Sequence, residues 1–478
     1  MISKQAINAQ YKNTLTVDQA WYYKIIPSNL ENGVLTLLVQ ESKNNSGLTD
    51  ELEIILGKPV QISPASDSFI EEQLQKLYPK SGQLLNTSQT ETYRINVQSD
   101  LFLETLVKEA KSLNSSDIHI ETYGEKCRIR FRVDGHLIDR HKINKAEYPI
   151  LINKIKIAAS ADIAEKRMPQ DGRIRFKINN SNLDIRVSIL PTLYGEKIVL
   201  RLLGSDASHI DIERLGFKPD ELARYKLAIQ KPTGIILISG PTGSGKTTTL
   251  YATLKQLNKT TSNILTIEDP IEYTLDGVNQ VQLKEDIGLT YTEALRTFLR
   301  QDPDVIMLGE IRDAQTAQMA IRAALTGHLV LSTIHTNSAW GTISRLIDMG
   351  VPGYLLAGTL NLSVAQRLVR TLCPNCKSKA VLDRNELPTK YNNINISEHY
   401  LPKGCNSCHF TGYKGRKAIY EVININKELT DEIKLNSTNI DSYCKTNKIT
   451  KLSENALNLF IDGETTLEEI YPYLINED

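Results

Sequence analysis

Short apolar runs alternate with longer stretches of helical spacing between residues 219 and 370. Four mainly apolar runs have the length of buried strands, at residues 234–240, 263–269, 304–310 and 328–334. Strands of this kind, separated by helices, are typical of a mainly parallel sheet covered by helices. We therefore predict an α/β core in this part of the chain.

A pattern with period two marks residues 92–204. In the segment 128–133, Ile129, Phe131 and Val133 alternate with Arg128, Arg130 and Arg132, and a similar segment returns at 173–178. This alternation predicts strands with one apolar and one charged face. A stretch of helical apolar spacing at 101–113 precedes them. The plainest interpretation of the arginines is a solvated face that discourages edge pairing.

The remaining segments are less informative. Residues 1–90 contain one apolar run, 34–39, that predicts a strand, and polar sequence at 81–91 indicates a linker. Residues 205–218 have the character of a second connector. The chain has 478 residues, which predicts three or four folded units.

Composition limits the function classes. Hydrophobic residues make up 41%, which is typical of a globular protein, and Lys plus Arg equals Asp plus Glu at 56 each. The charge balance therefore gives no indication of a nucleic-acid or membrane partner. The N-terminus lacks a signal-peptide pattern, and no apolar stretch reaches the roughly 18 residues of a spanning helix. We expect a cytoplasmic protein that other proteins recruit to a membrane.

A phosphate-binding motif follows the first apolar run of the core. Its glycines allow the backbone N–H groups to face a phosphate, and the helix that follows adds a partial positive charge. Lys246 can reach the β- and γ-phosphates, while the Thr247 hydroxyl can bind Mg²⁺. A glycine-rich turn without nucleotide is the alternative. The candidate ATP-binding residues are Gly240, Pro241, Thr242, Gly243, Ser244, Gly245, Lys246, Thr247 and Thr248.

Acidic side chains stand at the ends of neighbouring predicted strands, where a parallel sheet binds its ligands. Glu268 and Glu310 can orient water or act on Mg²⁺ through its hydration shell. We interpret both as functional, whereas Asp269 fits a helix N-cap equally well. His328 and His335 flank the last of the four runs. They either sense the γ-phosphate or are structural.

Four of the six cysteines form two Cys-x-x-Cys pairs, namely Cys373 with Cys376 and Cys405 with Cys408. Two such pairs can supply four thiolates to one tetrahedral ion, which predicts a closed, structural Zn²⁺ site. Redox pairs or unligated thiols are the alternative. We interpret the adjacent His409 as a bystander.

These motifs together resemble those of the ATPases of type II secretion systems and type IV pilus assembly. The resemblance covers roughly residues 92–478 and is looser before that. Retraction ATPases usually lack the cysteines, which weighs against a retraction motor. The motif segments are 116–121 with 130–135 (second N-terminal domain), 168–175 and 184–203 (leading into the ATPase domain), 240–251 (Walker A), 266–273 (Asp box), 304–313 (Walker B) and 326–339 (His box).

The resemblance implies an α/β, multidomain fold with a RecA-like P-loop ATPase core, a PAS-like α/β N-terminal domain and a small Cys₄ metal-binding subdomain. The implied divisions are 1–90 (partner-docking domain), 92–204 (second N-terminal domain), 205–218 (linker), 219–370 (P-loop core), 371–418 (metal-binding subdomain) and 419–478 (C-terminal helical region).

It also implies a hexameric ring in which arginines of the second N-terminal domain complete the nucleotide site. By motif these are Arg186 and Arg201, with Arg173 as a weaker candidate. An arginine on the transferring phosphate stabilises the developing charge. The implied partners are inner-membrane platform and docking proteins. The short region 1–90 favours secretion over pilus assembly.

We therefore expect an ATP hydrolase that powers pilin or pseudopilin assembly, without a nucleic-acid partner. Two alternatives from other classes remain. One is a ring-shaped DNA translocase or helicase, against which the neutral charge balance and the Asp and His boxes argue. The other is a non-catalytic scaffold that binds nucleotide, against which Glu268 and Glu310 argue.

Overall fold

A computed structural model describes the chain in two compact units, which meet in sequence at residues 91 and 92. Each unit is described by itself. The predicted linker at 81–91 and residues 205–209 of the predicted connector lie outside the described part. The described residues are 14–15, 17–31, 34–43, 47–56, 58–78, 99, 101–178, 181–203, 210–383, 386–391, 394, 396–437 and 439–475.

In its described residues, the first unit contains a small three-stranded sheet and three α-helices. The central strand β2 pairs antiparallel with β1 and parallel with β3. Strand β2 coincides with the run predicted at 34–39, and its Leu37 packs in a core with Leu52 and Leu74. The elements are α1 (Val17–Tyr23), β1 (Ile25–Glu31), β2 (Val34–Gln40), α2 (Leu48–Leu56), β3 (Val60–Ala65) and α3 (Asp67–Leu77).

The second unit begins with an antiparallel six-stranded sheet in the order β6-β5-β4-β9-β8-β7. In β5, Ile129 and Phe131 are buried while Arg128, Arg130 and Arg132 are half-buried, so the predicted period of two is confirmed as far as Arg132. Helices α4 and α5 pack on the apolar face. The elements are α4 (Phe102–Ser112), β4 (Asp117–Tyr123), β5 (Lys126–Val133), β6 (His136–Ile143), α5 (Tyr148–Ala158), β7 (Gln170–Ile178), β8 (Ser181–Thr192) and β9 (Gly195–Leu203).

The second sheet of this unit has seven strands in the order β12-β11-β13-β14-β10-β15-β18. All neighbours are parallel except β15 and β18, so the predicted α/β class is confirmed. The four predicted runs form four adjacent strands at its centre. The strands are β10 (Gly234–Ser239), β11 (Ile264–Glu268), β12 (Asn279–Gln282), β13 (Val305–Leu308), β14 (Leu329–Ile334), β15 (Leu360–Leu372) and β18 (Tyr413–Asn424).

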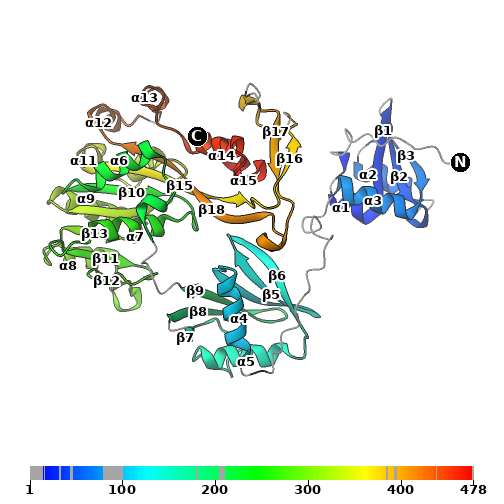
Figure 1. Ribbon diagram of the computed structural model, residues 1–478, viewed down its shortest axis with the longest axis horizontal. Coiled ribbons are helices and arrows are strands. Elements are labelled where there is room, and N and C mark those ends of the chain that lie inside the picture. The colour runs from blue at the N-terminus through cyan, green and yellow to red at the C-terminus, as the bar shows by residue number, and fades with distance from the viewer. Residues whose placement is uncertain are drawn as a thin grey trace. The chain divides into compact units, whose positions relative to one another are not determined.

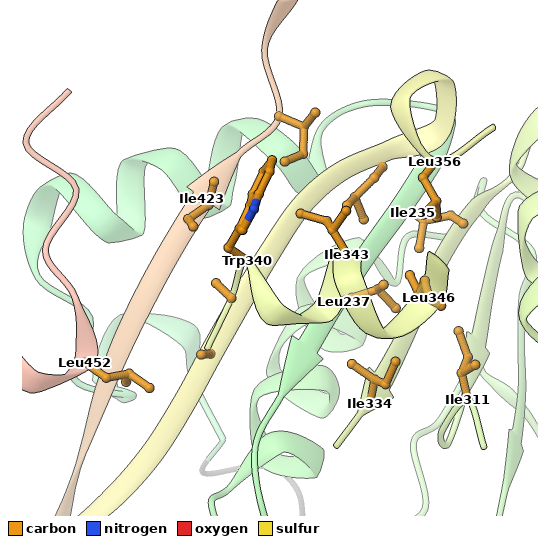
Figure 2. Packing of buried hydrophobic residues seen from close by; sticks show 14 of the residues in the cluster. Ile235, Leu237, Ile311, Ile334, Trp340, Ile343, Leu346, Leu356, Ile423 and Leu452 are labelled. Atoms are coloured by element: carbon orange, nitrogen blue, oxygen red, sulfur yellow. The ribbon is translucent and has the colours of Figure 1, made fainter. Parts of the chain in front are cut away.

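Helices cover both faces of this sheet. Successive residues of β10 enter different apolar clusters, as the pleat requires: Ile235 and Leu237 lie on one face, Ile236 and Ile238 on the other. Figure 2 shows Ile343 of α10 on the face of Ile235 and Leu237. The helices are α6 (Pro219–Ile229), α7 (Lys246–Leu257), α8 (Tyr291–Phe298), α9 (Ala314–Leu325), α10 (Gly341–Asp348) and α11 (Gly353–Thr359).

The C-terminal segments surround the long strands β15 and β18. Strand β18 runs across residues 418 and 419, where we expected the metal-binding subdomain to end, so the antiparallel edge of the sheet includes both sides of that boundary. None of the described helices combines the length and apolar character that crossing a bilayer requires. The remaining elements are β16 (Ser378–Val381), β17 (Glu398–Leu401), α12 (Lys427–Lys434), α13 (Asp441–Thr446), α14 (Leu452–Ile461) and α15 (Leu467–Ile475).

Candidate functional site

The predicted phosphate loop connects the end of β10 to the start of α7. Gly240 and Gly245 have φ angles of 151° and 87°, which other residues rarely adopt. A Cβ atom on Gly240 would lie 2.5 Å from the Gln366 carbonyl oxygen, and one on Gly245 would lie 2.8 Å from Gln366 Nε2. These glycines are therefore required both by their backbone conformation and by close contact with β15.

Two neighbouring side chains of β15 brace this loop. Gln366 donates a hydrogen bond to the Ser244 carbonyl at 2.9 Å and accepts one from Thr249 of α7 at 2.8 Å. The buried Arg367 donates to the carbonyl oxygens of Thr336 and Asn337, in the loop that follows β14. Successive residues of a strand point to opposite faces, so this pair joins the phosphate loop to the segment predicted as the His box.

The loop has the donors that a phosphate would use. Among the described residues, Ser244 Oγ is buried without a hydrogen-bond partner. The Lys246 ammonium donates to the carbonyl oxygens of Gly240 and Pro241, at 2.7 and 3.0 Å. Burial lowers the pKa of Lys246 to about 8, although the negative charge of Glu310 opposes this shift. An orphaned hydroxyl and a lysine folded onto its own loop both fit the phosphates of ATP.

Glu310 lies at the same sheet edge, after β13. Arg312 Nε donates to its Oε1 at 2.6 Å, and the Arg312 Nη2 is 3.5 Å from Asp269 Oδ2. His335, which follows β14, places Nε2 3.3 Å from Glu310 Oε2. The strands β11, β13 and β14 are adjacent, so their carboxyl ends bring these four side chains together. The Glu310 side chain is 18% exposed, which leaves it open to water.

Glu268 is in a different environment, although it ends the neighbouring strand β11. Its residue is only 3% exposed. Its carboxylate accepts hydrogen bonds from Tyr251, from Thr266 at 2.7 Å and from Gln280 at 3.1 Å. The side chain is therefore enclosed among neutral donors beneath the edge of the site.

His328 requires a correction. It precedes β14 while His335 follows it, and six residues of strand separate the two by roughly 20 Å. The backbone of His328 pairs with Gly234, at the start of β10, and its Nδ1 lies 2.8 Å from the Ala323 carbonyl. His328 thus lies at the edge of the sheet opposite the phosphate loop, and the structure groups only His335 with the candidate site.

The arginines of the six-stranded sheet form a row. Direct cross-strand pairing places Arg173, Arg186 and Arg201 next to one another on β7, β8 and β9. Asp117 of β4 and Arg132 of β5 continue the row. Residues directly opposite one another have Cβ atoms about 5 Å apart, and like charges there repel each other. The row is therefore a place where an anion would be stabilising.

The arginines of this row differ in their hydrogen-bond partners. Arg173 is bonded to Asp184 through two nitrogens, at 3.0 and 2.6 Å, and Arg201 Nε donates to Asp117 at 3.0 Å. Arg186 instead reaches the segment that follows β11 of the seven-stranded sheet, where Nη2 donates to the Ile271 carbonyl at 3.0 Å.

The partners of Arg186 belong to the segment predicted as the Asp box. Burial lowers the pKa of Arg186, and the charges of Glu272 and Asp269 oppose this shift. Burial raises the pKa of Glu272, and Arg186 and Arg201 oppose it. Arg186 and Arg201 therefore act electrostatically on the segment that follows β11.

The four cysteines predicted as ligands converge, with their sulfur atoms all within 4.8 Å of one another. Cys373 and Cys405 are 3.8 Å apart at Sγ, and Cys376 and Cys408 are 3.7 Å apart. A tetrahedral ion with Zn–S bonds of about 2.3 Å places its sulfurs about 3.8 Å apart. The four side chains fit a Zn²⁺ ion, and they lie where β15 ends and β18 begins.

Several residues of the site were not predicted from the sequence. Gln366 and Arg367 lie in a strand that follows the last motif, so no pattern marked them. Arg312 and Gln280 donate hydrogen bonds to the predicted acids Glu310 and Glu268, but these contacts depend on side-chain positions that the sequence does not show. A count of cross-strand register from the strand ends could have found the row of arginines.

Comparisons with known proteins agree with this geometry. A family model described as Type II/IV secretion system protein matches residues 96–472. The chain is 39% identical over 482 residues to the type IV pilus assembly ATPase PilB of Myxococcus xanthus, covering 93% of this chain and 83% of that protein. It is 43% identical over 375 residues to the type II secretion system protein E of Pseudomonas aeruginosa, covering 77% and 74%.

Solved structures share the fold. The Legionella pneumophila ATPase DotB has a TM-score of 0.60 at 22% identity, covering 82% of this chain and 98% of that one. The pilus retraction motor PilT, solved with bound ADP, has a TM-score of 0.52 at 26% identity, covering 77% and 95%.

Proposed function

The chain belongs to the type II/IV secretion system protein family, that of the secretion and pilus-assembly ATPases, and from this we propose that it hydrolyses ATP to drive the assembly of pilin-like subunits. The observation that carries the proposal is the phosphate loop, where Lys246 and the unpartnered Ser244 hydroxyl meet at the sheet edge that carries Glu310. Relatives named for pilus assembly and for type II secretion support both kinds of machine.

The proposed reaction uses the side chains of this edge. The loop amides, Ser244 and Lys246 hold the phosphates, and Thr247 supplies its hydroxyl to the Mg²⁺ that accompanies ATP. Glu310 orients a water molecule and accepts its proton as the water attacks the γ-phosphorus, and ADP leaves. Glu310 is favoured over Glu268 because it is the carboxylate that water can reach. His335, beside Glu310, is placed to report on the γ-phosphate.

Arg186 and Arg201 complete the site from the six-stranded sheet. Arg186 and Arg201 lie directly opposite one another, where like charges repel, and Arg186 already contacts the segment that follows β11. When ATP is bound, the guanidinium groups stabilise the charge on the transferring phosphate. When the phosphate leaves, the six-stranded sheet is released from the nucleotide site, and this movement is the force-producing step.

The wider assembly follows from the family. We propose a hexameric ring in the cytoplasm that inner-membrane platform and docking proteins recruit, with residues 1–90 as the docking region. A Zn²⁺ ion held by Cys373, Cys376, Cys405 and Cys408 would join the ends of β15 and β18, a structural role.

The test of the proposal is phosphate release by the full chain. Lys246→Ala should abolish turnover, while Lys255→Ala, in the last turn of the same helix, should leave it within about twofold. Unchanged turnover in Lys246→Ala would contradict the proposal.

Two further measurements address the alternatives. Hydrolysis that rises severalfold with DNA, and falls steeply with salt, would favour a DNA translocase. Nucleotide binding without phosphate release, with or without membrane partner domains, would favour a scaffold. Deletion of the gene, scored for surface pili and for secreted enzymes, separates pilus assembly from secretion.

A further inference from the structure

Glu268 lies at the centre of a buried network that joins three elements. Tyr251 comes from α7, and its hydroxyl donates to Glu268 Oε2. Gln280 comes from β12, and its Nε2 donates to Glu268 Oε1 at 3.1 Å. Thr266, in β11 itself, donates to the same oxygen at 2.7 Å. The carboxylate thus connects the helix that begins at the phosphate loop to β11 and β12, the two strands at one edge of the sheet.

The same network fixes the loop between β11 and β12. Gln280 Nε2 also donates to the Tyr273 carbonyl at 2.9 Å, and Gln280 Oε1 accepts from the Leu275 amide at 2.8 Å. The Tyr273 ring packs edge-on against Tyr251, with centroids 5.5 Å apart. Residues 270–278 are therefore held to α7 through Tyr251 and to β12 through Gln280.

This loop also contacts the other sheet of the unit. Arg186 donates to the Ile271 carbonyl at 3.0 Å, one peptide before the half-buried Glu272. A continuous chain of contacts therefore leads from the phosphate loop through α7, Tyr251 and Glu268 to the loop that Arg186 holds.

The enclosure of Glu268 argues against a direct part in hydrolysis. A general base must lie within hydrogen-bond reach of the attacking water. The Glu268 residue is 3% exposed, and its two oxygens already accept from three donors. A buried carboxylate held by neutral donors has two effects: it orders the groups that donate to it, and it is strongly disturbed when one of them is removed.

We propose that Tyr251 is a positioning residue that acts through Glu268. When nucleotide binds at α7, this network transmits the resulting movement to the loop 270–278 and so to Arg186. The proposal rests on the proposed ATPase function and specifies how the site signals to the six-stranded sheet. A nucleotide that seats on the N-terminus of α7 shifts the Tyr251 hydroxyl, Glu268 follows it, and the loop that carries Ile271 follows Glu268. Phosphate loss reverses the movement.

The test is Tyr251→Phe in the full chain, which removes one hydroxyl. The matched control is Tyr225→Phe, because Tyr225 is equally buried and its hydroxyl also bonds to α7, at Thr253 Oγ1, 2.6 Å away. We expect Tyr251→Phe to lower kcat by about 10- to 100-fold, the equivalent of one hydrogen bond to a charged group, with KM for ATP within about twofold. Tyr225→Phe should keep kcat within about twofold.

Hydrogen exchange distinguishes a positioning role of Tyr251 from a merely structural one. In the wild type, a non-hydrolysable ATP analogue with Mg²⁺ should slow exchange at both the phosphate loop and residues 270–278. In Tyr251→Phe the analogue should slow exchange at the phosphate loop alone. Retained protection of 270–278, unchanged kcat, or equal losses in both tyrosine variants would each overturn the proposal.

A double variant checks that the effect passes through Glu268. If it does, Tyr251→Phe combined with Glu268→Gln should lower kcat no further than Glu268→Gln alone, whereas independent effects would multiply. Failure of this proposal is separate from failure of the ATPase assignment, because hydrolysis by the wild type and its loss in Lys246→Ala test the latter independently.

Discussion

Exchanging each of two glutamates for glutamine should separate catalysis from stability. Glu268 ends β11 and Glu310 follows the adjacent strand β13, and both were predicted from the sequence as candidates to polarise water. Glu310→Gln should remove hydrolysis and leave the fold intact. Glu268→Gln should destabilise the ATPase core and lower hydrolysis through misplacement of the loop 270–278.

The magnitudes follow from the surroundings of each carboxylate. Glu310 pairs with the half-exposed Arg312, and an exposed ion pair contributes about 0–1 kcal/mol to folding. Loss of a general base costs about 10²- to 10⁴-fold in rate, or roughly 3–5 kcal/mol in the barrier. At Glu268 the glutamine amide would present N–H groups to a hydroxyl that donates, and one unsatisfied buried group costs about 1–3 kcal/mol of folding free energy.

The assay measures steady-state phosphate release and denaturant unfolding on the same preparations, with nucleotide affinity from a fluorescent analogue. Glu310→Gln should bind nucleotide like the wild type, because its change affects the reacting water rather than the phosphates already held by the loop. If Glu310→Gln retained most of its turnover, or if Glu268→Gln lost turnover without any loss of stability, the assignment of the two roles would be refuted.

Three other outcomes are expected. Burial lowers the pKa of Lys246 to about 8, so the unbound lysine loses its proton above that pH. Because the phosphates require this proton, ATP affinity should fall up to about tenfold per pH unit above pH 8. In a titration of ATP affinity from pH 7 to 10, Lys246→Arg should abolish this dependence. Arg186→Ala should lower kcat by about 10³-fold with little change in nucleotide binding, whereas Arg175→Ala, with a 79% exposed side chain, should have kcat near that of the wild type. Cys373→Ser should lower the zinc content measured by elemental analysis and the unfolding midpoint, while Cys444→Ser, outside the cluster, should keep its zinc.

The central strands of the core could be predicted because each is apolar on both faces and ends at a charged or glycine-rich segment. The sequence did not reveal that β15 and β18 extend the same sheet. Strand β18 carries charged residues along its exposed half, and its antiparallel pairing with β15 depends on a contact between segments some 50 residues apart. Long-range pairing of this kind leaves little trace in local periodicity.

The candidate site shows the same division between local and long-range information. The phosphate loop and the cysteine pairs are local motifs whose spacing alone defines their geometry. Glu268 and Glu310 could not be distinguished by sequence, because each lies at the end of a predicted apolar run. The hydrogen bonds that Tyr251 and Gln280 donate to Glu268 separate them in the structure. His328 was grouped with the site because it adjoins the same strand as His335. It precedes that strand, however, and in a parallel sheet the residue before a strand lies at the edge opposite the residue after it.

The row of arginines gives a physical reason why nucleotide and sheet movement should be coupled. Arg186 lies between Arg173, which is bonded to Asp184, and Arg201, which is bonded to Asp117. Arg186 donates instead to the neutral Ile271 carbonyl, and the negative charges of Glu272 and Asp269 act on it from the same segment. We infer that a phosphate near Ile271 would add negative charge beside Arg186 and draw the sheet towards the core. Departure of that phosphate would restore the repulsion among the arginines. Hydrolysis would therefore weaken the contact between the sheet and the core that ATP binding had strengthened, as a stepping motor requires.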